Sequence, residues 1–238
     1  MDLNKLAEAL VPDENVKPLE YYEKLYPERD LPKGAEVTRL APSPTGFMHL
    51  GNLYVAIANE RVAHQSGGVF YLRIEDTDEK RKVEGAVEVI HSSLKYFGIT
   101  FDEGADLTGD YGPYYQRQRA EIYHAYARDL IRRGLAYPCF CTEEELEKTR
   151  EHQTENKLLP GYYGEFAKCR NLAEKEIYNN LAAGKPYVIR LKSQGDVNIK
   201  RAFRDAVKGE ITVTENNQDV VILKSDGIPT YHFAHAVD

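Results

Sequence analysis

The sequence is poor in cysteine, since only Cys139, Cys141 and Cys169 occur among its 238 residues. So sparse and odd a number argues against a disulfide framework and favours reduced thiols or a metal site. Long apolar runs are also absent, because no stretch reaches about 18 consecutive apolar residues, and this excludes a membrane-spanning helix. The first residues lack the basic-then-apolar pattern of a secretory signal peptide. We therefore expect a cytoplasmic protein with no membrane partner.

An excess of positive charge is lacking as well. The formal net charge is −7 at pH 7, which is unusual for an RNA-binding protein, because Lys and Arg neutralise phosphates. The charge is unevenly distributed: residues 113–219 carry 18 Lys and Arg against 16 Asp and Glu, a net of +2, and the rest of the chain carries −9. The middle of the chain therefore holds the positive charge that an RNA partner needs, although a solvated surface is the simpler explanation of any individual charge.

Hydrophobic residues make up 42% of the sequence, enough for the core of one or two domains. Their spacing predicts strands at 37–41, 69–74, 136–140, 187–191, 211–214 and 220–224. It predicts helices at 3–10, 19–26, 50–65, 83–97, 117–133, 143–152, 173–183 and 230–237. Residues 99–116, rich in Gly, Asp and Tyr, are expected to form a long connection.

The order of these elements predicts an α/β fold. Strand, helix, strand and helix alternate first, which is typical of a Rossmann-like parallel sheet that binds a nucleotide. Mixed strands and charged helices then indicate an α+β insertion that splits this domain. The apolar run at 220–224 suits a buried parallel strand, where the first domain resumes. We expect an N-terminal extension at 1–35, the first half of the split domain at 36–112, the inserted domain at 113–219 and the start of the second half at 220–238.

The loop at residues 39–52 is the most informative segment. It follows a predicted strand, turns on two prolines and a glycine, and enters a predicted helix behind His49 and Gly51. Free backbone N–H groups and the positive end of the helix dipole make this position a site for anions. Gly51 has no Cβ, so a phosphate or a flat base can approach the main chain, and His49 can donate a hydrogen bond to a phosphoryl oxygen.

This segment resembles the signature of class I aminoacyl-tRNA synthetases, in the form found in glutamyl-tRNA synthetases. Four further segments, 73–78, 102–104, 112–114 and 223–232, carry the same resemblance, which extends from about residue 36 to the end. It implies a catalytic role for His49 and Gly51, and an inserted domain that binds the tRNA acceptor stem. The ATP-binding residues that it implies are Pro44, Thr45, Gly46, His49, Gly51 and Asn52. The family often has His where Asn52 stands.

The resemblance also implies a site for L-glutamate. Arg39 would bind the side-chain carboxylate, Ser43 and Glu75 would lie near the α-amino group, and Tyr231 would lie at the far end of the pocket. His235 follows Tyr231 by one helical turn and shares its face, although the family often has Asn at this position. Asp78 is expected to contact the tRNA 3′ end. The implied reaction joins glutamate to ATP with Mg2+ and transfers the product to tRNA(Glu).

A zinc site is a second expectation of the resemblance, because some relatives bind zinc with a Cys-x-Cys pair, a later Cys and a Tyr or His. Cys139, Cys141 and Cys169 supply three ligands, and Tyr162 or Tyr163 would supply the fourth. Buried apolar cysteines without a metal are an equally good explanation.

Two other functions remain open at the level of the sequence. One is the short paralogue that glutamylates a modified tRNA base, and the other is a noncatalytic tRNA-binding module. We expect the 238 residues to be a largely inactive fragment, because the family's lysine-rich signature loop and its anticodon-binding domains would lie beyond residue 238. The full-length protein is expected to be monomeric.

Overall fold

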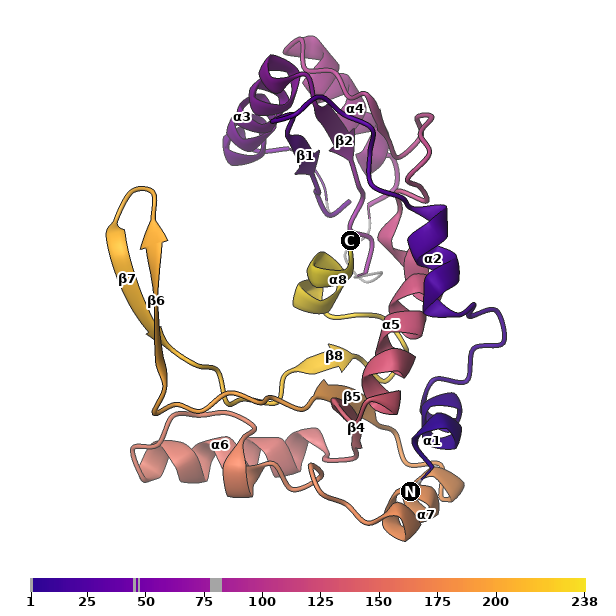
Figure 1. Cartoon of the computed structure of the whole chain (residues 1–238), viewed down its shortest axis with the longest axis vertical. Helices are drawn as coiled ribbons and strands as arrows, with labels where there is room; N and C mark the ends of the chain where they lie inside the picture. The colour runs from indigo at the N-terminus through magenta and orange to yellow at the C-terminus, as the bar shows by residue number, and fades with distance from the viewer. Residues whose placement is uncertain (1, 45, 47, 78–82) are drawn as a thin grey trace. The chain divides into compact units, whose positions relative to one another are not determined.

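The computed structural model describes residues 2–44, 46, 48–77 and 83–238, and it divides the chain into two compact units (Figure 1). Asn15–Ile122 forms one, here called the parallel-sheet unit. Residues 1–14 and Tyr123–Asp238 form the other, here called the antiparallel-sheet unit. Each unit has its own hydrophobic core.

The parallel-sheet unit contains strands β1 (Val37–Leu40), β2 (Val69–Leu72) and β3 (Glu103–Gly104), arranged in the order β1-β2-β3. All pairings are parallel, with Val37 opposite Val69 and Tyr71 opposite Glu103. Helix α3 (Leu50–Ser66) connects the first two strands and packs against both, and α4 (Ala86–Tyr96) precedes the third. This arrangement is the predicted α/β fold. Helix α2 (Leu19–Leu25) and the 3-10 helix η2 (Gln116–Arg119) complete the unit.

The core of this unit lies between the sheet and its helices. Phe70 and Leu72 point to the same face of β2, because every second residue of a strand does. Their buried side chains pack with those of α3 and α4. The members of this core include Ala56, Ala63, Phe70, Leu72, Ile90 and Leu94. Helix α3 ends at Gly67, whose φ of +72° is the left-handed conformation typical of a helix terminus.

The antiparallel-sheet unit is built around β4 (Ala136–Cys139), β5 (Val188–Leu191) and β8 (Val221–Leu223), in the order β4-β5-β8. Strands β6 (Lys200–Asp205) and β7 (Gly209–Thr214) form a separate hairpin, which projects away from that sheet in Figure 1. Its helices are α1 (Leu3–Leu10), α6 (Glu143–Glu155), η3 (Gly164–Phe166), α7 (Glu174–Ala182), α8 (Tyr231–Val237) and the part of α5 (Ala120–Arg132) from Tyr123 onward.

The three-stranded sheet of this unit has a different core on each face. Ala136 and Ile189 contribute to a core that also takes buried residues from α1, α5 and α8. Tyr137 and Cys139 contribute to a smaller core with Tyr162 and Cys169. Successive residues of one strand therefore serve two cores, as the period of two requires.

The structure confirms the predicted helices and the six predicted strands, with ends that shift by up to three residues. The expectation of a parallel strand at 220–224 is wrong, because β8 pairs antiparallel with β5. A short apolar run fits a buried strand of either direction, so hydrophobicity alone does not distinguish them. The connection at 99–116 contains β3, and the basic segment 200–205 contains β6, neither of which was predicted. Within the described residues, no helix is both long and apolar enough to cross a membrane.

Candidate active site and thiol cluster

His49 caps the N-terminus of α3 with its side chain. Its Nδ1 accepts a hydrogen bond from the backbone N–H of Gly51 at 3.1 Å, and the Oδ1 of Asn52 accepts one from the backbone N–H of His49 at 3.3 Å. Because a neutral imidazole carries one proton, an accepting Nδ1 leaves that proton on Nε2. The side chain is exposed, so its Nε2–H is available to a bound group.

Gly51 is needed for this geometry. A Cβ at this position would lie 2.9 Å from Cε1 and 3.0 Å from Nδ1 of His49, closer than side chains normally approach. Any other residue would push the imidazole away from the helix end. The His-x-Gly pattern thus has a local structural reason as well as a proposed chemical one.

A cavity of about 240 Å³ opens at this helix end. It brings together four of the residues expected to bind substrates, Ser43, Gly46, His49 and Asn52. Its lining consists of Pro42, Ser43, Gly46, Met48, His49, Asn52 and Ile90. Pro44 is buried, and its carbonyl accepts a hydrogen bond from the N–H of Val83 at 2.9 Å, so it shapes the loop. Thr45 and Asp78, two other expected site residues, lie outside the described residues.

The β1–β2 pairing continues beyond the strands and positions a charged cluster. The N–H of Arg73 donates to the carbonyl of Leu40, and the N–H of Glu75 donates to that of Pro42, both at 3.0 Å. Oε1 of Glu75 then lies 3.8 Å from Nη2 of Arg39 and 3.6 Å from Nη2 of Arg73. One carboxylate is therefore placed between two guanidinium groups at the carboxyl end of the sheet.

The sequence predicted no role for Arg73 in the site. Its side chain is only 3% exposed, compared with 16% for Arg39 and 11% for Glu75. A charged residue directly after the apolar strand 69–72 was the available signal. Asp76, by contrast, accepts a hydrogen bond from the N–H of Arg117 at 2.9 Å and so stabilises the start of η2.

Tyr231 and His235 belong to the antiparallel-sheet unit. They lie one turn apart on α8, as predicted, and their rings stack with centroids 6.0 Å apart and an interplanar angle of 12°. Tyr231 is 58% exposed, so this residue is not buried in the core of its own unit. Helix α8 is fixed by Thr230, whose hydroxyl donates to the carbonyl of Val221 at 2.8 Å.

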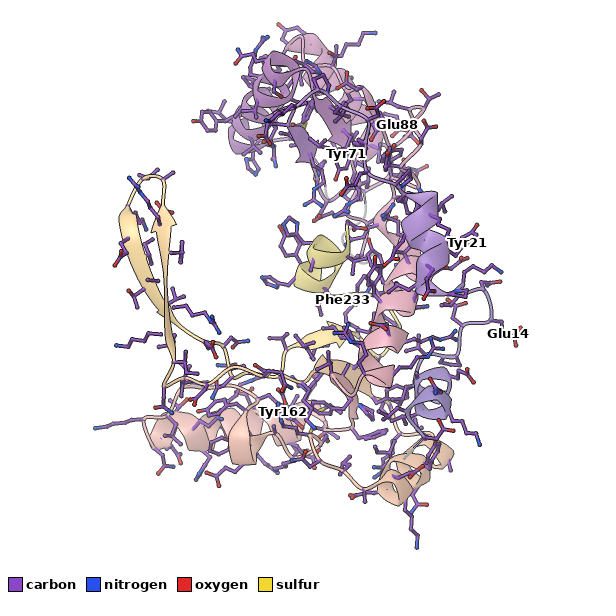
Figure 2. All side chains as sticks on the ribbon, in the orientation of Figure 1. Glu14, Tyr21, Tyr71, Glu88, Tyr162 and Phe233 are labelled. Carbon is purple, nitrogen blue, oxygen red and sulfur yellow. The ribbon has the colours of Figure 1, made fainter. Side chains whose placement is uncertain are left out.

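The three cysteines converge in the smaller core of the same unit. Their sulfur atoms all lie within 4.8 Å of one another, and Cys141 Sγ is 3.6 Å from Cys169 Sγ. The hydroxyl oxygen of Tyr162 lies 3.3 Å from Cys139 Sγ and 3.4 Å from Cys141 Sγ. Figure 2 labels Tyr162, which packs in this core near α6.

The spacing of these four atoms fits a tetrahedral metal site. With zinc–sulfur and zinc–oxygen bonds of about 2.3 and 2.0 Å, a tetrahedron has sulfur–sulfur edges of about 3.8 Å and sulfur–oxygen edges of about 3.5 Å. The Cys141–Cys169 sulfur–sulfur distance of 3.6 Å and the Cys141–Tyr162 sulfur–oxygen distance of 3.4 Å lie close to these values. Tyr163 does not share the cluster, because its hydroxyl donates to the carbonyl of Leu159 at 2.7 Å. Of the two candidate tyrosines, Tyr162 is the one with the required position.

The close approach of the thiols makes their pKa values differ. Hydrogen bonds from Cys141 and Cys169 lower the pKa of Cys139 strongly, whereas the pKa of Cys141 is raised by its hydrogen bonds to the other two thiols. Burial raises the pKa of the Tyr162 hydroxyl. A lowered thiol pKa favours the thiolate, which is the form that binds zinc.

Comparison with known proteins agrees with this geometry. The family model described as tRNA synthetases class I (E and Q), catalytic domain, matches residues 36–238. The chain therefore belongs to the class I tRNA synthetases of the glutamate and glutamine group.

Individual relatives point to glutamate. The chain is 56% identical over 223 residues to the glutamate–tRNA ligase of Clostridium beijerinckii, covering 92% of this chain and 40% of that protein. It is 54% identical over 244 residues to that of Clostridium perfringens, covering 100% and 44%. A crystal structure of a glutamate tRNA ligase from Elizabethkingia meningosepticum, in complex with its amino acid, matches with a TM-score of 0.76 and 37% identity, covering 85% of this chain and 41% of that one. The chain thus spans less than half the length of these relatives.

Proposed function

We propose that this chain is part of a glutamate–tRNA ligase, which activates L-glutamate with ATP and transfers it to the 3′ end of tRNA(Glu). The single observation that carries the proposal is the joint placement of an anion site at the start of α3 and the Arg39–Glu75 pair beside it. The first can receive a triphosphate, and the second can receive an amino acid with an extra carboxylate. As working expectations, the complete protein is monomeric and cytoplasmic.

Glutamate needs a fixed cation, a fixed anion and hydroxyl donors. Arg39 offers its planar guanidinium to the side-chain carboxylate, a geometry that lysine reproduces poorly. Glu75 offers its carboxylate to the α-ammonium group, and Ser43 is an exposed hydroxyl on the same loop. Tyr231 and His235 are assigned to the far end of the pocket by the resemblance to the family.

In the first step, an oxygen of the glutamate α-carboxylate attacks the α-phosphorus of ATP while the bond to pyrophosphate breaks, and glutamyl-adenylate forms. Such reactions depend on positioning and on stabilising the charge that develops on phosphoryl oxygens. The Nε2–H of His49 and the N-terminus of α3 supply hydrogen-bond donors there. Mg2+, when bound, neutralises the triphosphate. A ribose hydroxyl of the tRNA then attacks the adenylate carbonyl and AMP leaves, with Asp78 assigned to the tRNA end.

We further propose that Cys139, Cys141, Cys169 and Tyr162 bind a structural zinc ion. The four donor atoms form a closed set without an open position, which is typical of a structural site. Elemental analysis tests this directly. Less than about 0.2 zinc per chain, after purification without chelators, would contradict it.

The activity is tested on the longer protein to which the chain is proposed to belong. We expect ATP–pyrophosphate exchange that depends on glutamate, and charging of tRNA(Glu). Retained tRNA binding without either activity would instead identify a noncatalytic module. The 238-residue chain alone is expected to have little activity, and robust charging by it would contradict that expectation.

A further inference from the structure

Arg190 is a buried cation on β5. The residue is only 7% exposed, and its Nη1 donates a hydrogen bond to the backbone carbonyl of Asp219 at 2.8 Å. The guanidinium carbon lies 3.9 Å from the centre of the Tyr162 ring. Its Nε is buried and has no hydrogen-bond partner among the described residues. A buried charge of this kind needs a compensating anion.

Asp219, whose backbone carbonyl Arg190 contacts, does not supply that compensation through its carboxylate. Asp219 is only 1% exposed, and its Oδ1 accepts hydrogen bonds from the guanidinium of Arg170 and from the N–H of Ser193. Its Oδ2 accepts one from the hydroxyl of Tyr137. Arg170 therefore balances the charge of Asp219, and Arg190 meets only the backbone carbonyl of that residue. Within the described ranges, no ion pair joins Arg190 to a carboxylate.

The sheet register points Arg190 toward the thiol cluster. Tyr137 is paired with Arg190 and Cys139 with Val188, so these four side chains lie on one face of the β4–β5 ladder. Tyr162 covers that face, with its ring against Arg190 and its hydroxyl against Cys139.

We propose that Arg190 is the charge-balancing residue of the zinc–thiolate centre, an inference that rests on the zinc site proposed above. A zinc ion with three thiolates carries one net negative charge. The guanidinium of Arg190 carries one positive charge and lies against the phenol ring that completes the set. The buried unit of metal, thiolates and Arg190 is then electrically neutral, which removes the cost of burying either charge alone. The cation–π contact also fixes the orientation of the Tyr162 ring.

The test measures zinc affinity by competition with a chelator in the 238-residue chain. Arg190→Gln retains an N–H donor but removes the charge, and we expect its zinc affinity to fall about 10- to 100-fold, as for other groups that support metal ligands. Arg190→Lys restores the charge and is expected to restore most of the affinity. Arg150→Gln is the control, since Arg150 lines the same cavity of about 270 Å³ but is exposed and pairs with Glu147.

A double-mutant cycle separates charge from folding. Replacing Cys141 by Ser removes one thiolate and leaves a neutral centre, so in that background Arg190→Gln should change the affinity less than about threefold. Arg190→Met removes the same charge with an apolar side chain and gives a second measurement if Arg190→Gln does not fold. Equal zinc affinity of Arg190→Gln and the wild type would overturn the role of Arg190 while leaving the metal site intact. A wild-type chain that binds no zinc would overturn both.

Discussion

At the scale of single residues, His49 serves the fold and the proposed chemistry through different nitrogens. Nδ1 caps α3, and Nε2 carries the proton that is proposed to reach the phosphoryl group. Asn is a good helix cap and has no donor in the position of Nε2. The two roles can therefore be separated by substitution.

His49→Asn is expected to keep most of the stability of the chain, whereas His49→Ala is expected to lose about 1 kcal/mol through the missing cap. Both substitutions should slow adenylate formation in the longer protein by about 100-fold or more, the cost of one well-placed donor to a developing charge. Denaturant unfolding and pyrophosphate exchange measure the two effects. A wild-type rate of pyrophosphate exchange in the His49→Asn variant would show that the imidazole acts only as a cap.

Tyr114 predicts a specific dependence of stability on pH. It is 8% exposed, and burial, reinforced by the charge of Glu103, raises its pKa to about 12. An unfolded tyrosine ionises near pH 10, so folding favours the protonated form. Its contribution to stability is complete below about pH 10 and is lost as the pH rises toward 12.

Tyr114→Phe should therefore weaken the alkaline loss of stability by up to about 1.4 kcal/mol per pH unit between pH 10 and 12. Its baseline stability is expected to be lower, because the hydroxyl of Tyr114 accepts a hydrogen bond from the N–H of Tyr111 at 3.2 Å. Urea unfolding across this pH range measures both effects. An unchanged slope would contradict the assignment.

At the scale of elements, the sequence predicted helices better than strand pairing. The apolar period and the caps of α1, α3 and α6 are local signals, and these helices begin at the predicted residues. Strand β3 has only two residues, and β6 is basic and exposed, so neither shows a hydrophobic pattern. The direction of β8 depends on β5, more than 25 residues earlier, and no local property of its apolar residues encodes that partner.

Helix α1 illustrates an element held by side chains distant in sequence. Leu6, Ala7 and Leu10 are buried in the core of the antiparallel-sheet unit. Arg128 on α5 donates to the carbonyl oxygens of Val11 at 2.7 and 3.0 Å and of Asp13 at 2.7 Å. These bonds fix the end of the helix against its unit.

Arg128→Met should increase amide hydrogen exchange over residues 3–13 and lower the free energy of unfolding by about 1–3 kcal/mol, because two carbonyls lose a charged donor. Arg133→Met is the matched control, since Arg133 follows the same helix and makes only an exposed pair with Asp129 at 3.1 Å. That control should change stability by less than about 1 kcal/mol. Equal amide hydrogen exchange over residues 3–13 in the two variants would refute the anchoring role of Arg128.

At the scale of the whole molecule, two compact units with separate cores imply two units of local stability. Leu94→Ala in the parallel-sheet unit and Ile131→Ala in the other should each cost about 2–5 kcal/mol, since both side chains are at most 1% exposed. Amide hydrogen exchange should accelerate mainly over residues 37–104 in the first variant and over residues 136–191 in the second. Uniform acceleration throughout the described residues in both variants would show a single cooperative unit.

The candidate site shows the same division between local and distant information. His49, Gly51 and Asn52 are neighbours in sequence, so their mutual geometry follows from one helix start. The position of Arg73 beside Glu75 depends on the β1–β2 register, and that of Tyr162 beside three thiols depends on the packing of a loop on β4. Sequence resemblance supplied Arg39 and Glu75, but the supporting cations Arg73 and Arg190 required the structure.

The most direct test of the proposed function compares glutamate with glutamine as substrates in ATP–pyrophosphate exchange by the longer protein. The wild-type protein and its Arg39→Lys variant are measured side by side. The bidentate geometry of Arg39 predicts exchange with glutamate, little with glutamine, and a loss of about 10- to 100-fold in kcat/KM for glutamate in Arg39→Lys. Equal use of the two amino acids, or an unchanged kcat/KM in the variant, would contradict the assignment of Arg39 to the substrate carboxylate.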